Sequence, residues 1–458
     1  MVHTIKKYTF AKSLILKTFP MKKVLIFLFI WFPILFLGSC KSDMDVSPEI
    51  MPDIVKYRSQ QEMIEQSIAA YNHLYPTKSR SSRQVANVVP VRMTPSRGEL
   101  PNPLYAINFE DSAGYVIMAS NPNVEPVMAV IEEGSFDPNN ENEGFNCFLK
   151  TAENYAPTIS NKDLEIGIDT LRLDFTYWEE DVDTLVYLKV KPHLDTWWGQ
   201  KEPYNKYCPV SFDKETNSYK NCLTGCVPTA LSMIMAYFQN SLFFKITFDG
   251  SNRNVRLNWS EIKRHKYTPA SNIGSDNFLC TETGHNQLAL IMRELGHICG
   301  TQYGLGISTT AADMIPKGLD AIGIKDVQSK NYYTINGIID NGTLLLMYGN
   351  GHCFIIDGAD CIWFKYTLRL YRENGLGIRK LISTEYSESM YNYAHVVWGY
   401  DNLAVGYFND NILAMMKPVR LDAGAYSSDD SQNFYYGLKY YPLKLTFTLT
   451  PLDPVPVH

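Results

Sequence analysis

The stretch Asn221-Cys-Leu-Thr-Gly-Cys-Val-Pro-Thr-Ala-Leu-Ser-Met-Ile-Met-Ala-Tyr-Phe238 decides how the rest of this chain is interpreted. Its apolar residues recur at helical spacing, which predicts a buried helix. Pro228 is tolerated only in the first turn of a helix, so the helix is expected to begin near Cys226. Free amides and the positive end of the helix dipole favour a thiolate there, and the thiolate is the nucleophilic form of cysteine. Cys226 is therefore a candidate nucleophile, and a buried structural cysteine is the alternative.

Two histidines further along the chain are candidates for a general base, which a thiol nucleophile needs within hydrogen-bonding reach. His352 is the better candidate, because glycines open the start of an apolar strand in Gly349-Asn-Gly-His-Cys-Phe-Ile-Ile-Asp-Gly358. His395, in Tyr393-Ala-His-Val-Val-Trp-Gly-Tyr400, is the rival and also lies on a predicted strand. A core histidine with satisfied hydrogen bonds is the alternative for each. Gln200 is a candidate oxyanion donor, although a loop glutamine usually has no such role.

Composition narrows the class of protein. The chain has 458 residues, 45% of them hydrophobic, and a formal net charge of −6, which suits a globular protein of two to three domains. No basic cluster interleaved with aromatic residues lies beyond the N-terminal segment, so nucleic acid is not an expected partner. Cys222 and Cys226 form C-x3-C without a second pair of ligands, so neither a zinc site nor another cofactor is expected. The eight cysteines that follow Cys40 show no spacing typical of a disulfide framework.

The N-terminal segment has the features of an export signal. Lys22 and Lys23 precede an apolar run at residues 24–37 that is short for a membrane span. The run ends in Leu37-Gly-Ser-Cys40, which resembles a bacterial lipobox. Residues 1–39 are therefore predicted to be a signal peptide, Cys40 a lipidated residue and residues 40–58 a tether. An uncleaved N-terminal anchor is the alternative, and an outer-membrane or cell-surface location is expected.

Residues 59–160 are expected to form a small α+β unit. An amphipathic helix is predicted over residues 59–75, where Ser59 and Glu62 fit a capping box. Residues 76–103 are polar and punctuated by prolines, so they are expected to form a loop. Three strand-like runs and a closing helix follow, at residues 104–109, 114–120, 124–131 and 144–155.

A linker or maturation zone is predicted at residues 161–189, followed by a larger domain at residues 190–458. In this domain the helical patterns come first, and a further amphipathic helix is predicted at residues 286–299. Strand patterns follow at residues 344–348, 353–356, 362–371, 380–384, 395–400 and 438–449. Helices followed by a run of strands predict an α+β fold with an antiparallel sheet, not a doubly wound one.

The order of several motifs resembles that of streptopain-like cysteine peptidases, whose catalytic domain is papain-like. They are Trp198-Gly-Gln200, Thr224-Gly-Cys-Val-Pro-Thr-Ala230, Gly351-His-Cys-Phe-Ile-Ile-Asp-Gly358 and His395-Val-Val-Trp-Gly399. The resemblance extends from about residue 190 to the C-terminus. The upstream unit, with Gly114-Tyr-Val-Ile-Met-Ala-Ser120 and Gly134-Ser-Phe-Asp137, resembles the inhibitory propeptide of the same family.

The resemblance implies a role for each candidate residue. Cys226 falls on the nucleophile, His352 on the general base, Gln200 on the oxyanion donor and Trp398 on the tryptophan beside the histidine. It makes His395 a strand residue next to that tryptophan. His352 would hold Cys226 as a thiolate with a lowered pKa, and a thioester would form and be hydrolysed. Protein or peptide substrates, and the propeptide as an intramolecular inhibitor, are the implied partners.

Three departures from the family pattern bear on activity. Val397 stands where the family has an asparagine that can orient the histidine, and valine cannot form that hydrogen bond. Tyr400-Asp-Asn-Leu403 replaces a glycine-rich stretch. A hairpin-like insertion, at residues 362–372 and 379–383, separates Gly358 from His395 and is expected to lie near the active site.

Three functions remain open from the sequence. The first is an exported, lipid-anchored cysteine endopeptidase made as a zymogen, with the maturation cut between about residues 155 and 190. The second is a catalytically impaired surface protein that binds or inhibits, using the same fold. The third keeps the Cys–His pair but transfers the acyl group to an amine.

Overall fold

The computed structural model describes residues 57–76, 83–93, 102–122, 124–157, 175–239, 241–264, 282–325, 327–331, 335, 343–373, 378–416 and 434–439. The predicted signal peptide, Cys40 and nearly all of the predicted tether lie outside these ranges. Within them the fold is α+β, with helices packed on an antiparallel sheet, as the order of the sequence patterns predicts. None of the helices in the described ranges is long and apolar enough to cross a membrane.

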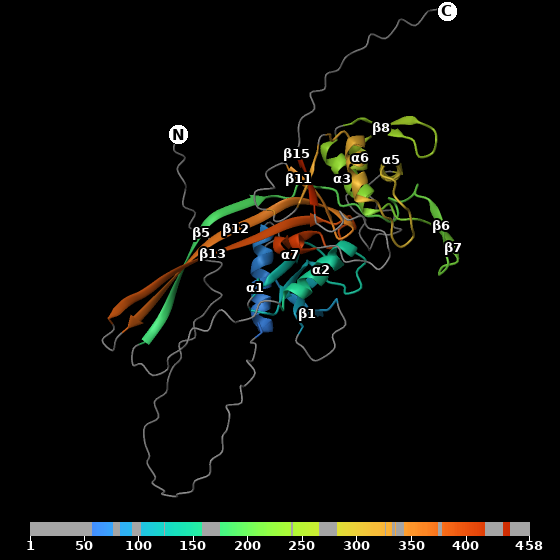
Figure 1. The fold of residues 1–458 in the computed structure, drawn as a ribbon. Helices are drawn as coiled ribbons and strands as arrows, with labels where there is room; N and C mark the ends of the chain where they lie inside the picture. The colour runs from blue at the N-terminus through green and yellow to red at the C-terminus, as the bar shows by residue number, and fades with distance from the viewer. Residues whose placement is uncertain are drawn as a thin grey trace, which may run out of the picture.

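The N-terminal unit contains two α-helices and four strands of the main sheet (Figure 1). Its elements are α1 (Gln60–Leu74), β1 (Val85–Val91), β2 (Leu104–Phe109), β3 (Tyr115–Ala119), β4 (Val127–Ile131) and α2 (Glu143–Tyr155). The Ser59 side chain accepts a hydrogen bond from the Glu62 amide, which confirms the predicted cap of α1. The expected loop at residues 76–103 contains β1, so this prediction was wrong there. The sequence of β1 lacks the alternation of a half-buried strand, and its exposed Pro90 also argued against one.

The C-terminal unit places its helices first along the chain. These are α3 (Cys226–Phe238), α4 (Trp259–Ile262), α5 (Glu282–Ile298) and α6 (Ile315–Ala321), with the short hairpins β6 (Val210–Asp213) to β7 (Ser218–Asn221) and β8 (Phe243–Ile246) to β9 (Arg253–Arg256). The later elements are β10 (Ser329–Asn331), β11 (Thr343–Gly349), β12 (His352–Glu373), β13 (Arg379–Val397), β14 (Gly406–Asn409), α7 (Asp410–Met415) and β15 (Phe434–Lys439). Most of the strand predicted at residues 438–449 lies outside the described ranges.

One sheet runs through both units. Its strand order is β1-β2-β3-β4-β14-β13-β12-β11-β15-β10, and the two units join where β4 pairs antiparallel with β14. At this junction Ala129 is opposite Phe408 and Val130 is opposite Tyr407. The N-terminal unit is therefore bound to the C-terminal unit by backbone hydrogen bonds as well as by side chains.

An arm of three strands projects from the body of the molecule (Figure 1). The hairpin of β12 and β13 forms two of them, and β5 (Phe175–Val190) pairs with β12 along its outer part. Most of the predicted linker, residues 175–189, thus belongs to a strand of the sheet. The predicted insertion forms the outer part of the arm. At about 3.3 Å per residue, β12 carries its tip on the order of 70 Å from His352, so the insertion lies away from the histidine rather than beside it.

Apolar clusters cover both faces of the central sheet. On one face, α3, α5 and α6 pack over β11 and one side of β12 and β13. On the other face, Phe145 and Phe148 of α2 pack edge-on against Phe408 of β14, with ring centroids 6.0 and 4.9 Å apart. The ring of Trp398, just after β13, packs edge-on against the ring of Phe408, with centroids 5.1 Å apart. This aromatic cluster spans both units, so α2 covers the end of the sheet at which β12 begins and β13 ends.

Candidate active site

Cys226 is the first residue of α3. The residue before it, Gly225, has a φ of 91°, a left-handed conformation that favours glycine. The backbone amides of Cys353 and Val227 lie near the sulfur of Cys226 and act to lower the pKa of its thiol. The predicted position of this thiol at a helix N-terminus is confirmed, and Cys353 brings the start of β12 beside it.

His352 is the first residue of β12 and is almost fully buried. Its Nε2 lies 2.9 Å from the backbone carbonyl oxygen of Trp398. A carbonyl oxygen only accepts hydrogen bonds, so Nε2 carries the proton and Nδ1 is left as the acceptor. Among the described residues, the hydrogen bonds of His352 do not include the sulfur of Cys226. The two side chains therefore come from adjacent segments but are not joined in this structure.

The pKa values of Cys226 and His352 are both shifted in the direction that favours the neutral form. Burial raises the pKa of the Cys226 thiol to about 11, an effect only partly offset by the Cys353 amide. Burial also lowers the pKa of His352 to about 4, despite the hydrogen bond to Trp398. At neutral pH the site therefore holds a thiol and a neutral imidazole. The lowered thiol pKa expected from the sequence is not present in this structure, because both groups are desolvated.

A backbone hydrogen bond links the segment of Gln200 to the turn that precedes Cys226. The amide of Thr224, in the turn before α3, donates to the Gln200 carbonyl at 3.1 Å. The Gln200 side chain is buried, and its Nε2 donates to the carbonyl oxygen of Gly399 at 3.5 Å. All four residues predicted for the site are thus brought together around the start of α3 and the end of β13.

His395 has a structural environment. Its Nδ1 lies 2.6 Å from Oδ1 of Asp357, and both side chains are fully buried. The other oxygen of Asp357 accepts hydrogen bonds from the amides of His193 and Leu194, at 3.0 and 2.8 Å. The pair therefore fixes the segment that enters the C-terminal unit after β5. His395 therefore binds Asp357 and not the Cys226 thiol, which agrees with the choice of His352 as the better candidate for the base.

The side chain of Val397 does not face His352. It is fully buried in the apolar cluster beneath α3 and α5, whereas His352 packs against Phe354, Trp398 and Tyr400 on the other side. The group that holds His352 is the main-chain carbonyl of Trp398, the residue after Val397. Because every residue carries a carbonyl, this interaction leaves no signal in the sequence.

Helix α2 of the N-terminal unit covers His352. A Cβ atom placed on Gly144 would stand 2.6 Å from Cδ2 of His352 and 2.5 Å from Cε3 of Trp398, so only a glycine fits. Around this contact, the Asn142 side chain donates to the Leu403 carbonyl at 3.0 Å, and Glu141 pairs with Lys201. The sequence predicted α2 but not where it docks.

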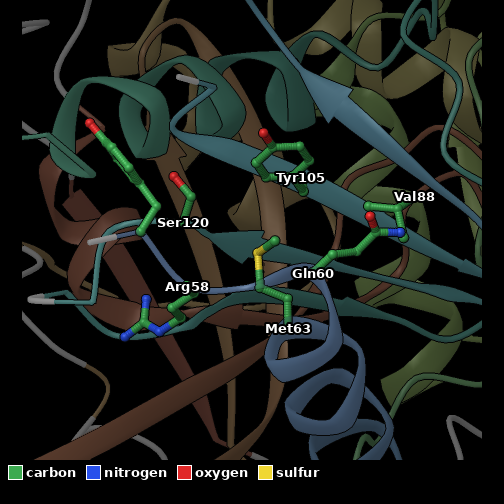
Figure 2. Close-up of a pocket in the computed structure, with 7 residues that line it drawn as sticks. Arg58, Gln60, Met63, Val88, Tyr105 and Ser120 are labelled. Carbon is green, nitrogen blue, oxygen red and sulfur yellow. The ribbon is translucent and has the colours of Figure 1, made fainter. Parts of the chain in front are cut away.

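A cavity elsewhere is unconnected with this site. A hollow of about 180 Å³ lies in the N-terminal unit at the start of α1, and Figure 2 shows Arg58, Met63, Tyr105 and Ser120 around it. Arg58 donates to main-chain carbonyls, including that of Ala119 at 3.0 Å, so it ties the chain before α1 to the sheet. Among the described residues no group of His, Cys, Asp or Glu side chains is arranged as metal ligands.

Two family models match the chain. The model of the peptidase C10 family matches residues 198–408, and the model of the Spi protease inhibitor matches residues 65–156. The first contains all four predicted site residues, and the second contains α2.

Solved structures also resemble the chain. One is a fragment of Prevotella intermedia prointerpain A with one cysteine mutated to alanine. It has 19% identity and a TM-score of 0.50, and the match covers 79% of this chain and 100% of that one. Another is active wild-type Prevotella intermedia interpain A cysteine protease, with 21% identity, a TM-score of 0.34 and coverage of 54% and 94%. The similarity to the prointerpain A fragment supports the fold of this chain and nothing further. No curated protein matches the chain.

Proposed function

This chain belongs to the peptidase C10 family of cysteine endopeptidases and carries an inhibitor domain ahead of its peptidase domain, and from this we propose how it acts. It is a zymogen in which Cys226 is the nucleophile, His352 the general base, Gln200 an oxyanion donor and Trp398 the residue that holds the histidine. It is exported through the signal at residues 1–39 and anchored by a lipid on Cys40.

The position of α2 carries the zymogen assignment. The N-terminus of this helix packs on His352, and the burial that results keeps the thiol and the imidazole neutral. A neutral thiol is a poor nucleophile, so the chain is latent as long as α2 is docked. Withdrawal of α2 returns water to the site, and the pKa values of both groups then move back toward their usual ranges.

The hydrogen bond from Nε2 of His352 to Trp398 favours the tautomer that catalysis needs. With Nε2 protonated, Nδ1 accepts the proton of the Cys226 thiol once the ring turns toward it. The thiolate attacks the scissile carbonyl carbon, and the Gln200 side chain and the Cys226 amide stabilise the oxyanion. His352 then protonates the leaving amine, and water hydrolyses the thioester to free the sulfur.

Substitution of the pair tests the activity. The full chain should convert to a shorter form and hydrolyse a peptide substrate, and both activities should be blocked by a thiol reagent. Cys226→Ala and His352→Ala should each remain uncut and lose at least about 10³-fold in peptide hydrolysis. Cys222→Ala is the matched control, because it removes a nearby thiol four residues before Cys226. Proteolysis that survives Cys226→Ala would refute the assignment.

A catalytically impaired surface protein is the second candidate, and Val397 favours it because the family asparagine is missing. An epoxide-type thiol inhibitor separates the two functions. One equivalent of label on Cys226 in the processed protein supports the peptidase, whereas no label on a correctly folded, processed chain supports the impaired protein.

A further inference from the structure

Residues 141–144 of the inhibitor unit lie across the candidate active site. At one end of this segment, the backbone of Gly144 lies against the imidazole ring of His352. At the other end, the carboxylate of Glu141 forms an ion pair with Nζ of Lys201. The Cα atoms of residues 141 and 144 are at most about 11 Å apart, so this short segment joins the candidate base to Lys201.

Lys201 is the residue after the oxyanion donor Gln200, and a turn of the backbone fixes its position. Its carbonyl oxygen accepts hydrogen bonds from the amides of Tyr204 and Asn205, at 2.9 and 3.2 Å. Consecutive Cα atoms are about 3.8 Å apart, so a substrate that reaches the Gln200 side chain also comes within reach of a lysine side chain at residue 201. Because its Nζ meets Glu141, this side chain is directed toward the segment that covers the site.

The ion pair of Lys201 with Glu141 lies at the rim of the site and not in the core. The two side chains are 61% and 67% exposed, so water surrounds the pair and it adds little to the stability of the fold. Another carboxylate can therefore replace that of Glu141 without the cost of burying a charge. When the inhibitor unit leaves, Glu141 leaves with it, and the ammonium group of Lys201 becomes available at the open site.

We propose that Lys201 is a specificity-determining residue that binds an acidic side chain of the protein substrate. The substrate carboxylate takes the place that Glu141 holds in the precursor, so the inhibitor segment and the substrate use the same cation. A lysine ammonium is a point charge on a flexible stem, so it can pair with either aspartate or glutamate. This inference rests on the proposed function and adds a substrate class to it, namely peptide chains that carry an acidic residue close to the scissile bond.

Matched pairs of peptides test this preference in the processed enzyme. One peptide of each pair carries glutamate at a single position near the scissile bond, and the other carries glutamine, which has the same shape without the charge. At the position that meets Lys201, the kcat/KM of wild type should be about two- to fivefold higher for the glutamate peptide, the range expected of an exposed ion pair. About 0.5 M salt should move this ratio toward one, because salt screens exposed charges.

Substitutions of Lys201 identify the group that is responsible. Lys201→Met keeps most of the stem and removes the charge, so its glutamate-to-glutamine ratio should fall to about one. Lys201→Arg keeps the charge and should keep the preference, whereas Lys201→Glu should invert it. Lys206→Met is the matched control, because it removes an exposed lysine whose Nζ donates to Asn286 at 2.8 Å instead of pairing with Glu141, and it should leave the ratio as in wild type.

The proposal is overturned if wild type prefers glutamate at no position, if the preference survives Lys201→Met, or if Lys206→Met abolishes it as well. An equal fall in kcat/KM for both peptides of a pair in Lys201→Met, with their ratio unchanged, would show that Lys201 does not read the substrate charge and would also overturn it. A failure of the proposed function looks different, because the processed wild type would then hydrolyse neither peptide of any pair.

Discussion

The Cα atom of Gly144 in α2 lies against the imidazole ring of His352 at the start of β12, with no room for a Cβ atom between them. These two residues belong to different units of the chain, and each is placed by the end of a secondary-structure element. The backbone of α2 at Gly144 covers His352 directly, so this contact depends on the absence of a side chain at residue 144.

Gly144→Ala should therefore weaken latency. The new methyl group would stand under 3.0 Å from both His352 and Trp398, so α2 must shift, at a cost of about 1–3 kcal/mol. We expect conversion of the precursor to speed up about tenfold, measured by gel densitometry, with unchanged kcat/KM of the processed enzyme. Lys150→Ala, on the same helix, is the control. An unchanged conversion rate would show that α2 does not hold the site closed.

Glu125 makes the junction of the two units sensitive to pH. It precedes β4, and the Asn409 side chain donates to its Oε2, whereas its Oε1 is buried without a hydrogen-bond partner in the part of the chain described. Burial raises the pKa of Glu125 to about 7, and the nearby Asp410 adds to the effect. Tyr155 of α2 and Tyr393 of β13 are the other titratable neighbours.

The sign of this effect follows from proton linkage. Between pH 4.5 and 7 the folded chain holds a proton on Glu125 that the unfolded chain has lost, so stability falls as pH rises through this window. The loss should reach about 3 kcal/mol relative to Glu125→Gln, which stays neutral. Urea unfolding in a Cys226→Ala background, with the exposed Glu215→Gln as control, measures it. Equal pH dependence of Glu125→Gln and wild type would contradict the prediction.

Replacing Val397 by the family asparagine should destabilise the chain. The Val397 side chain is fully buried in the apolar cluster beneath α3 and α5, so an amide there would lose its hydrogen bonds to water. We expect Val397→Asn to lower the free energy of unfolding by about 1–3 kcal/mol more than Val397→Ala, which loses volume without adding polarity. If Val397→Asn is the more stable variant, a polar partner must lie within reach of residue 397.

Shortening the arm should leave the chemistry intact. Thr367 and Tyr386 are opposite each other in β12 and β13, so residues 367–386 can be replaced by a two-residue Asn-Gly turn. The kcat/KM for a short peptide should stay within about twofold of wild type, because the removed part begins on the order of 50 Å along the strand from His352. A loss of more than tenfold, with the melting temperature unchanged, would place the arm at the cleft.

The proposed lipidation of Cys40 predicts how the two units partition after cleavage. The wild-type precursor should enter the detergent phase of a Triton X-114 extraction, and Cys40→Ser should remain in the aqueous phase. Because Cys40 precedes the inhibitor domain, the processed peptidase should become aqueous while the inhibitor domain stays with the detergent. Cys147→Ser is the control for loss of a thiol. Detergent partitioning of Cys40→Ser would argue for an uncleaved anchor instead.

Features set by neighbouring residues could be predicted from the sequence. Pro228 and the apolar spacing after it placed the start of α3 at Cys226, and Ser59 with Glu62 placed the start of α1. The order of the motifs identified the family, and the preference for His352 over His395 agrees with the buried pair that His395 makes with Asp357. Helix caps and amphipathic patterns act over a few residues, so they can be recognised without knowing the fold.

Only the tertiary structure decided the state of the site. The pairing of β4 with β14, the docking of Gly144 on His352 and the bond from the Trp398 carbonyl to the imidazole each involve a backbone group and join residues far apart in the chain. Every residue carries a backbone N–H or C=O group, so residue type does not reveal the strand pairing or the bond from the Trp398 carbonyl, and the glycine at residue 144 does not show where α2 docks. The pKa values of Cys226 and His352 follow from the same packing, because desolvation depends on what covers a group and not on its neighbours in sequence. The sequence by itself determined which groups form the candidate site, and the fold decided that they are held neutral and apart.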